Sequence, residues 1–129
     1  MKLHILIAAL ALSATAMPTL AADPAAGEKA FSVCKACHRL GEGAKSTAGP
    51  VLNGVVGRKA GSLDGFNYSD ALKQSGLTWD KASLAEYLKN PKAKVPGTKM
   101  AYAGLKDDTK IADIIAYLSQ FDVDGTQRP

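Results

Sequence analysis

The sequence predicts a small all-α domain in which about four helices are joined by long loops. Helix-capping residues and apolar residues at helical spacing recur along the chain, whereas no segment shows the apolar–polar alternation of a β-strand. Residues 41–65 contain seven glycines, which indicates a winding loop region. Because loops of this length in a compact domain usually have a function, we expect them to wrap around a bound group.

The first two predicted helices begin at residues that cap helix N-termini. Asp23 is followed by Pro24, which is preferred at the first helical position, and this helix runs toward Cys34. Ser69 caps a short second helix, which Gly76 ends. Both cysteines of the chain therefore lie at the end of the first helix.

The third and fourth predicted helices lie in the second half of the chain. Asp80 caps the third helix, which stops at Asn90-Pro91. The fourth covers about residues 108–121, and its apolar residues recur at helical spacing. These are Ile111, Ile114, Ile115 and Leu118. Residues 124–129 are expected to form a loose tail.

We expect the first and last helices to pack against each other. Gly27 and Phe31 lie on the first, and Ile114 and Tyr117 lie on the last. A glycine opposite an aromatic ring lets two helix backbones approach closely. We assign these residues a structural role only.

The first residues have the layout of a secretory signal peptide. Lys2 is followed by an apolar run over residues 5–12 and then by small residues. The run is well short of the ~20 residues that span a bilayer. We expect cleavage after Ala21, with Ala22 as the alternative, so that residues 22–129 form a single domain. An uncleaved N-terminal anchor is the other interpretation.

The most specific motif is Cys34-Lys35-Ala36-Cys37-His38. Its C-x-x-C-H spacing puts two thiols and an imidazole within reach of one haem. The thiols can add to the two vinyl groups of the porphyrin, and the histidine can bind the iron. The same residues could also form a thioredoxin-like redox pair or half of a zinc site.

The inventory of metal ligands favours the haem. Once the signal peptide is removed, His38 and Met100 are the remaining histidine and methionine, and both cysteines lie in the motif. A structural zinc site needs four Cys or His ligands, and three are left. Electron-transfer cytochromes use a histidine and a methionine as axial ligands. The sequence therefore predicts one covalently attached haem c, with His38 and Met100 bound to its iron.

From about residue 25 to residue 121, the chain resembles the class I c-type cytochromes, and most closely the bacterial cytochrome c2 subgroup. The resemblance implies a small class I cytochrome c fold, all-α, with helices and long loops around one covalently bound haem. The matching segments keep the order and spacing of the family. They are residues 34–38, 49–52, 57–59, 66–69, 77–79, 87–91 and 96–100.

The resemblance also implies roles around the haem. It assigns the carbonyl of Pro50 as the acceptor for the second ring nitrogen of His38. Other polar side chains would line the haem environment: Arg58, Tyr68 and Trp79 near a propionate, and Tyr87 and Thr98 beside the sulfur of Met100. Tyr87 also lies on the apolar face of its helix, where plain packing is the alternative.

The charge pattern indicates a docking surface. The chain has sixteen Lys and Arg residues and twelve Asp and Glu residues. Loss of Lys2 with the signal peptide leaves a net charge of +3 before the cofactor is counted. Lysines gather in sequence around the haem motif and Met100, and we interpret them as a surface for acidic redox partners. They are Lys35, Lys45, Lys89, Lys92, Lys94 and Lys99. A solvated lysine face without a partner is the alternative.

Together these features predict a periplasmic one-electron carrier without enzymatic activity. The resemblance implies a cytochrome bc1-type complex as donor, and either a terminal oxidase or a photosynthetic reaction centre as acceptor. We expect a monomer that binds no nucleic acid and does not insert stably into a membrane. The alternative is a haem-based gas-binding or sensing protein, in which Met100 would leave the iron readily.

Overall fold

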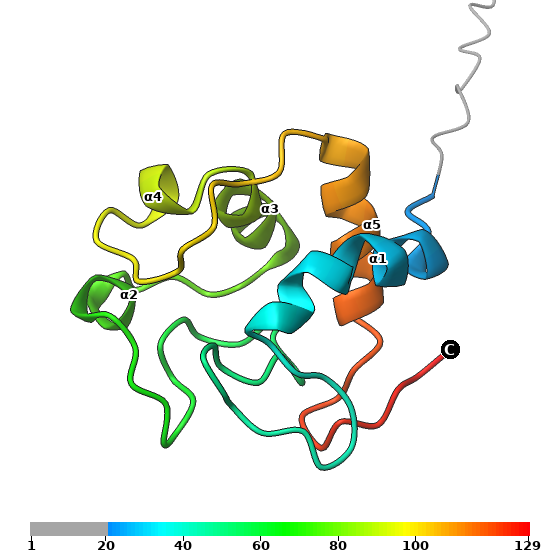
Figure 1. The fold of residues 1–129 in the computed structure, drawn as a ribbon, viewed down its shortest axis with the longest axis horizontal. Helices are drawn as coiled ribbons and strands as arrows, with labels where there is room; N and C mark the ends of the chain where they lie inside the picture. The colour runs from blue at the N-terminus through cyan, green and yellow to red at the C-terminus, as the bar shows by residue number, and fades with distance from the viewer. Residues whose placement is uncertain (1–20) are drawn as a thin grey trace, which may run out of the picture.

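The computed structural model describes residues 21–129, and helices connected by long loops make up this part of the chain (Figure 1). The signal peptide predicted over residues 1–21 lies outside the described residues, apart from its last residue. The predicted all-α class is confirmed. The helices are α1 (Pro24–Ala30), the 3-10 helix η1 (Phe31–Ala36), α2 (Asp70–Gln74), α3 (Lys81–Lys89), α4 (Pro91–Lys94) and α5 (Asp108–Leu118).

The predicted helix starts are confirmed by their capping hydrogen bonds. The side chain of Asp23 accepts from the backbone of Ala25 at the start of α1, and that of Ser69 accepts from Leu72 at the start of α2. Asp80 caps α3 in the same way. Each cap satisfies a backbone N–H that the helix itself leaves without a partner.

The first helix differs from its predicted form, and one further short helix was not predicted. The first helix is α-helical only to Ala30 and then tightens into η1, as helix C-termini often do. The predicted stop at Asn90-Pro91 is confirmed, since α3 ends at Lys89. The short helix α4 was not predicted; it starts at Pro91, with the Asn90 side chain accepting from the backbone of Ala93. Proline ends a preceding helix and is also well suited to the first position of the next.

The expected contact between the first and last helices is confirmed. Figure 1 shows α1 crossing α5 at one side of the molecule. Gly27 is buried there, and a Cβ atom added to it would lie 1.9 Å from the carbonyl oxygen of Asp113 on α5. The rings of Phe31 and Tyr117 pack with their centroids 5.7 Å apart. The two helices thus form one wall of the core.

The end of the chain is ordered, contrary to the loose tail expected from the sequence. After α5 the backbone turns back, so that Asp122 N–H donates to the Thr126 carbonyl at 3.0 Å and Arg128 N–H donates to the Gln120 carbonyl at 2.7 Å. An ion pair of 2.9 Å between Asp122 and Arg128 closes the turn. We call residues 121–128 the C-terminal hook. Gly125, which follows Asp124, has a φ of +87° and allows the reversal.

Two long segments complete the fold. The first runs from η1 to α2 and contains most of the glycines, and the second is the strap, residues 95–107, between α4 and α5 (Figure 1). Side chains from both segments line the same cavity. Within residues 21–129, no helix is long and apolar enough to cross a membrane.

Candidate functional site

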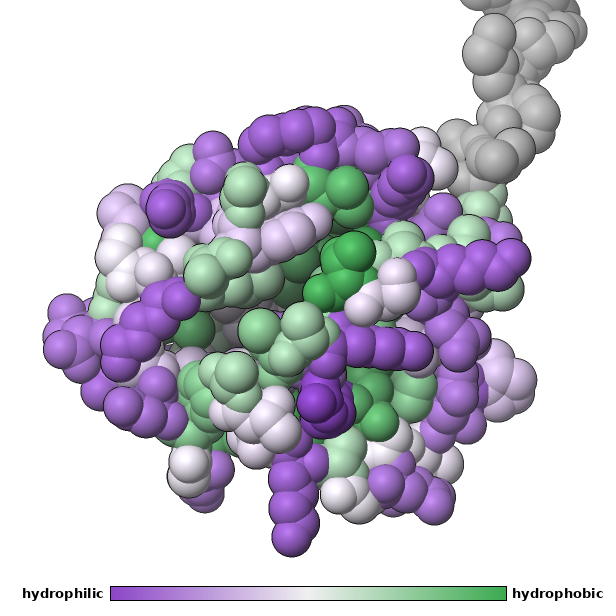
Figure 2. All heavy atoms as spheres, viewed as in Figure 1, coloured by the Kyte–Doolittle hydropathy of each residue, from purple (hydrophilic) through white to green (hydrophobic). Residues whose placement is uncertain are grey.

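The loops and helices surround a cavity of about 360 Å³. Figure 2 shows it as an apolar hollow, with hydrophilic side chains around much of its rim. Its walls come from η1, the loops before α2, the helix α3, the strap and α5. The loops predicted to wrap around a bound group therefore do enclose a space for one.

The cysteines of the C-x-x-C-H motif both line this cavity. Cys34 is half-buried at the end of η1, Cys37 is exposed, and the two thiols are free. Burial, and secondarily the nearby Cys37, raise the pKa of the Cys34 thiol. Reactive redox cysteines have lowered pKa values instead. The raised pKa of Cys34 therefore gives no sign of the activated thiolate that a thiol–disulfide oxidoreductase needs.

The imidazole of His38 is held in the form that can bind a metal. Its Nδ1 lies 2.8 Å from the carbonyl oxygen of Pro50. A carbonyl can only accept, so Nδ1 carries the proton and Nε2 has a free lone pair. Burial lowers the pKa of His38 more strongly than this hydrogen bond raises it, which favours the neutral ring.

Gly49 is a site residue whose role the sequence did not reveal. A Cβ atom at this position would lie 2.6 Å from Cε1 and 2.8 Å from Nδ1 of His38. The backbone of Gly49 thus lies directly against the ring, and its N–H donates to the Cys37 carbonyl at 2.9 Å. Any larger residue would push the imidazole away from its present position. The Gly-Pro pair was the one signal available, and an ordinary turn explains it equally well.

Met100 lies on the strap and is half-buried at the cavity wall. The hydroxyl groups of Tyr87 and Thr98 lie 2.6 Å apart. The backbone N–H of Met100 donates to the same Thr98 oxygen at 3.3 Å. The structure therefore brings together the three residues expected on this side, and Tyr87 makes a polar contact in addition to its packing.

Three further predicted residues, Arg58, Tyr68 and Trp79, line the same cavity. Arg58 donates to the carbonyls of Val51 and Asn53, each at 3.2 Å, which fixes its guanidinium group. Burial lowers the pKa of Arg58, and the neighbouring Tyr68 opposes that shift. An arginine has five N–H donors, so donors remain for an anionic group in the cavity.

The hydroxyl of Tyr68 indicates which kind of group the cavity can bind. Its buried hydroxyl is the one side-chain polar atom of residues 21–129 that is fully buried without a hydrogen-bond partner. Leaving such a group unsatisfied costs about 1–3 kcal/mol. The apolar cavity fits a haem, since two thiols, a neutral imidazole and a thioether line it. The hydroxyl of Tyr68 beside the guanidinium group fits the propionates of the haem.

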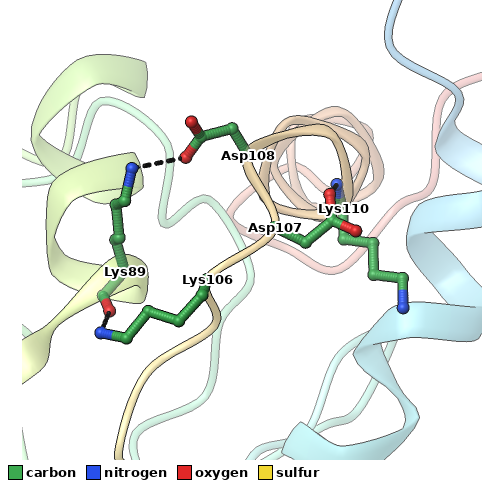
Figure 3. A network of polar contacts seen from close by, with 5 residues as sticks. All are labelled: Lys89, Lys106, Asp107, Asp108 and Lys110. Atoms are coloured by element: carbon green, nitrogen blue, oxygen red, sulfur yellow. Dashed lines mark hydrogen bonds and ion pairs between the residues drawn. The ribbon is translucent and has the colours of Figure 1, made fainter.

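The six predicted docking lysines fall into two groups. Lys89 pairs with Asp108 at 2.9 Å, and the ammonium of Lys106 donates to the Lys89 carbonyl (Figure 3). Lys94 pairs with Glu86. In the described part of the chain, the other four form no ion pair; these are Lys35, Lys45, Lys92 and Lys99.

Comparisons with known proteins show the family of this chain. The Cytochrome c family model matches residues 24–122. The chain is 51% identical over 117 residues to cytochrome c2 of Blastochloris viridis, covering 91% of this chain and 92% of the relative. It is 57% identical over 118 residues to cytochrome c2 of Rhodomicrobium vannielii, covering 92% and 93%.

A solved structure supports the same assignment. Cytochrome cH from Methylobacterium extorquens superposes with a TM-score of 0.72 at 59% sequence identity, over 75% of this chain and 97% of that one. The chain therefore belongs to the cytochrome c family, most like the bacterial cytochromes c2, and is an electron carrier with a covalently bound haem c.

Proposed function

We propose that this protein carries single electrons in the periplasm, and that His38 and Met100 would hold the iron of its haem. One observation carries the proposal. A single apolar cavity gathers the thiols of Cys34 and Cys37, a neutral imidazole and a thioether. These are the groups that hold the haem and its iron in electron-transfer cytochromes c.

Each of these residues has a separate task in the proposed mechanism. When bound, the haem supplies an iron that takes up and gives up one electron. Cys34 and Cys37 would form the thioether bonds that hold the haem, and His38 would give its Nε2 lone pair to the iron. The Pro50 carbonyl fixes the orientation of the ring and makes it a stronger electron donor. Met100 would give a thioether sulfur to the iron, which would disfavour the ferric charge and raise the reduction potential.

We assign the polar end of the cavity to a propionate. Tyr68 would donate its otherwise unpartnered hydroxyl to the carboxylate, and the fixed guanidinium of Arg58 would supply the opposite charge. Trp79 has an indole N–H that can serve as a further donor. These contacts would hold a buried negative charge that an apolar wall alone could not stabilise.

Replacement of Tyr68 by phenylalanine tests this assignment, because a propionate contact determines whether the change lowers or raises the free energy of unfolding. A hydrogen bond to a charged acceptor is worth about 1.5–3 kcal/mol, so Tyr68→Phe is expected to lower the unfolding free energy of the haem-bound protein by about that amount. Urea unfolding measures it. Tyr117→Phe, which removes a hydroxyl outside the cavity lining, should stay within about 0.5 kcal/mol of the parent protein. A Tyr68→Phe variant as stable as the parent, or more stable, would contradict the propionate contact.

The proposal extends to compartment and partners. The predicted signal peptide over residues 1–21 would direct residues 22–129 to the periplasm as a monomeric domain. The relatives named cytochrome c2 support a bc1-type complex as donor and a reaction centre or an oxidase as acceptor. Acidic faces of these complexes would dock on the six predicted docking lysines. Since Lys89 and Lys94 already pair with carboxylates of their own chain, we expect the other four to contribute more.

A lysine-to-glutamine series tests the docking surface. With a purified bc1-type complex at low ionic strength, we expect the double change Lys35→Gln and Lys99→Gln to slow electron transfer by roughly tenfold, because charge steering is lost. Lys89→Gln should have a smaller effect. The matched control is Lys81→Gln, at a second cavity beside the C-terminal hook. The differences should shrink at high salt, and a control that slows the reaction equally would argue against this surface.

A further inference from the structure

We propose that the C-terminal hook is a positioning element for His38. It braces residues 41–54, called the 41–54 loop, and this loop presents the Pro50 carbonyl to the imidazole. The inference rests on the proposed role of His38 as an iron ligand. The C-terminal hook itself contributes no residue to the lining of the cavity.

The tip of the 41–54 loop is fastened to the haem motif. Its Pro50 carbonyl accepts the hydrogen bond from His38 at 2.8 Å. The Gly49 N–H and the Thr47 hydroxyl both donate to the Cys37 carbonyl, at 2.9 and 2.8 Å. Any shift of this tip would therefore move the acceptor that orients the imidazole.

The base of the loop is closed by the side chain of Asn53. Its Oδ1 accepts from the Gly41 N–H at 2.9 Å, and its Nδ2 donates to the Gly41 carbonyl at 2.8 Å. The side chain is buried, with 7% of the residue exposed. Opening the base would leave buried donors and acceptors without partners, which is costly. Residues 41–53 therefore form a closed ring.

The C-terminal hook packs against both ends of this ring. A Cβ atom at the buried Gly125 would lie 2.2 Å from the Gly41 carbonyl oxygen. At the other end, the Gly54 N–H donates to the Phe121 carbonyl at 3.0 Å. A Cβ atom at Gly54 would lie 2.7 Å from a methyl carbon of Val123. The hook thus contacts backbone on both sides of the bridge made by Asn53.

The hook is itself rigid enough to act as a brace. The side chain of Arg128 pairs with Asp122 at 2.9 Å, and the hook's backbone closes on itself through two further hydrogen bonds. Loosening the hook would let the 41–54 loop move and would weaken the Pro50–His38 hydrogen bond. The imidazole would then donate less electron density and stabilise ferric iron less, so the reduction potential would rise.

Gly125→Ala in the full haem-bound protein tests this inference. Position 125 requires a left-handed backbone and has no room for a methyl group. We expect amide exchange at Val51 and Leu52 to accelerate by roughly tenfold or more, and the reduction potential to rise. The Leu105 amide, which donates to the Leu88 carbonyl at 2.9 Å on the strap side, should keep its exchange rate.

A matched control separates the brace from simple backbone strain. Gly76 also has a positive φ, +67°, but a Cβ atom there would meet nothing within 4 Å. Gly76→Ala should therefore leave both the potential and the exchange at Val51 and Leu52 unchanged. Arg128→Gln, which removes only the ion pair and the arginine contacts of the hook, should shift both readouts in the same direction as Gly125→Ala, by less.

The outcomes decide between the alternatives. If Gly125→Ala does not fold, Arg128→Gln carries the test. The inference is overturned if the folded variants keep the parent potential and exchange at Val51 and Leu52, or if Leu105 accelerates equally. Failure of the proposed function would be visible separately, because the unmodified protein would then lack the spectrum of histidine-ligated haem. The exchange measurements report on the contact between the C-terminal hook and the 41–54 loop, whether or not His38 binds the iron.

Discussion

Replacing Met100 by alanine is expected to leave the haem covalently attached but to abolish the far-red sulfur–iron band of the ferric protein. We have assigned the attachment to Cys34 and Cys37, which lie on η1 and just after it, whereas Met100 lies on the strap. Loss of the thioether should also lower the reduction potential by on the order of 0.1 V, since axial ligands tune haem potentials over about 0.8 V. Absorption spectroscopy and a redox titration measure both effects.

The same experiment separates electron transfer from gas binding. Lys99→Ala, which alters the neighbouring exposed residue, serves as a control and should retain the band. The reduced Met100→Ala protein should bind carbon monoxide, because a coordination position is open, and the parent protein should not. A band that survives in Met100→Ala would exclude Met100 as the ligand. A parent protein that binds carbon monoxide as readily as the variant would favour the gas-binding alternative.

Gly27→Ala should destabilise the protein, although helix propensity alone predicts the opposite. In an exposed helix interior, this change stabilises by about 1 kcal/mol. Here the new methyl carbon would lie 1.9 Å from the Asp113 carbonyl oxygen, so α1 would have to move away from α5. We expect a loss of about 3 kcal/mol or more in unfolding free energy, measured by denaturant unfolding.

Another residue of the helix α1 provides a control for the substitution at Gly27. Lys29→Ala changes an exposed residue of the same helix and should alter stability by no more than about 0.5 kcal/mol. The rings of Phe31 and Tyr117, which pack beside the crossing, should show changed chemical shifts in Gly27→Ala only. Stabilisation by Gly27→Ala would mean that the two helix backbones do not approach as closely as described.

The sequence predicted the features that depend on local signals. Asp23, Ser69 and Asp80 cap their helices because a short side chain can reach a backbone N–H two or three residues ahead, and that geometry is the same in any fold. The cofactor was also predictable, since the C-x-x-C-H spacing needs no tertiary information. His38 and Met100 are the predicted iron ligands because they are the histidine and the methionine that remain after the predicted signal peptide is removed.

The features that the sequence did not predict depend on contacts between distant segments of the chain. The role of Gly49 follows from the place where His38 packs, and the pairing of Lys89 with Asp108 follows from how α3 lies beside the start of α5. The ordered C-terminal hook was missed for the same reason, because Gly125 contacts Gly41 in another part of the chain. The Pro50 contact was expected only through family resemblance, and the structure contains that hydrogen bond.

We have proposed that His38 and Met100 hold the iron of a covalently attached haem throughout its redox cycle. The most direct test is the absorption spectrum of the purified mature protein in its oxidised and reduced states. We expect a low-spin c-type haem in both states, a sulfur–iron band in the ferric form, and haem that stays with the protein in acidified organic solvent. A colourless protein, an extractable haem or a ferric spectrum without the sulfur–iron band would contradict it.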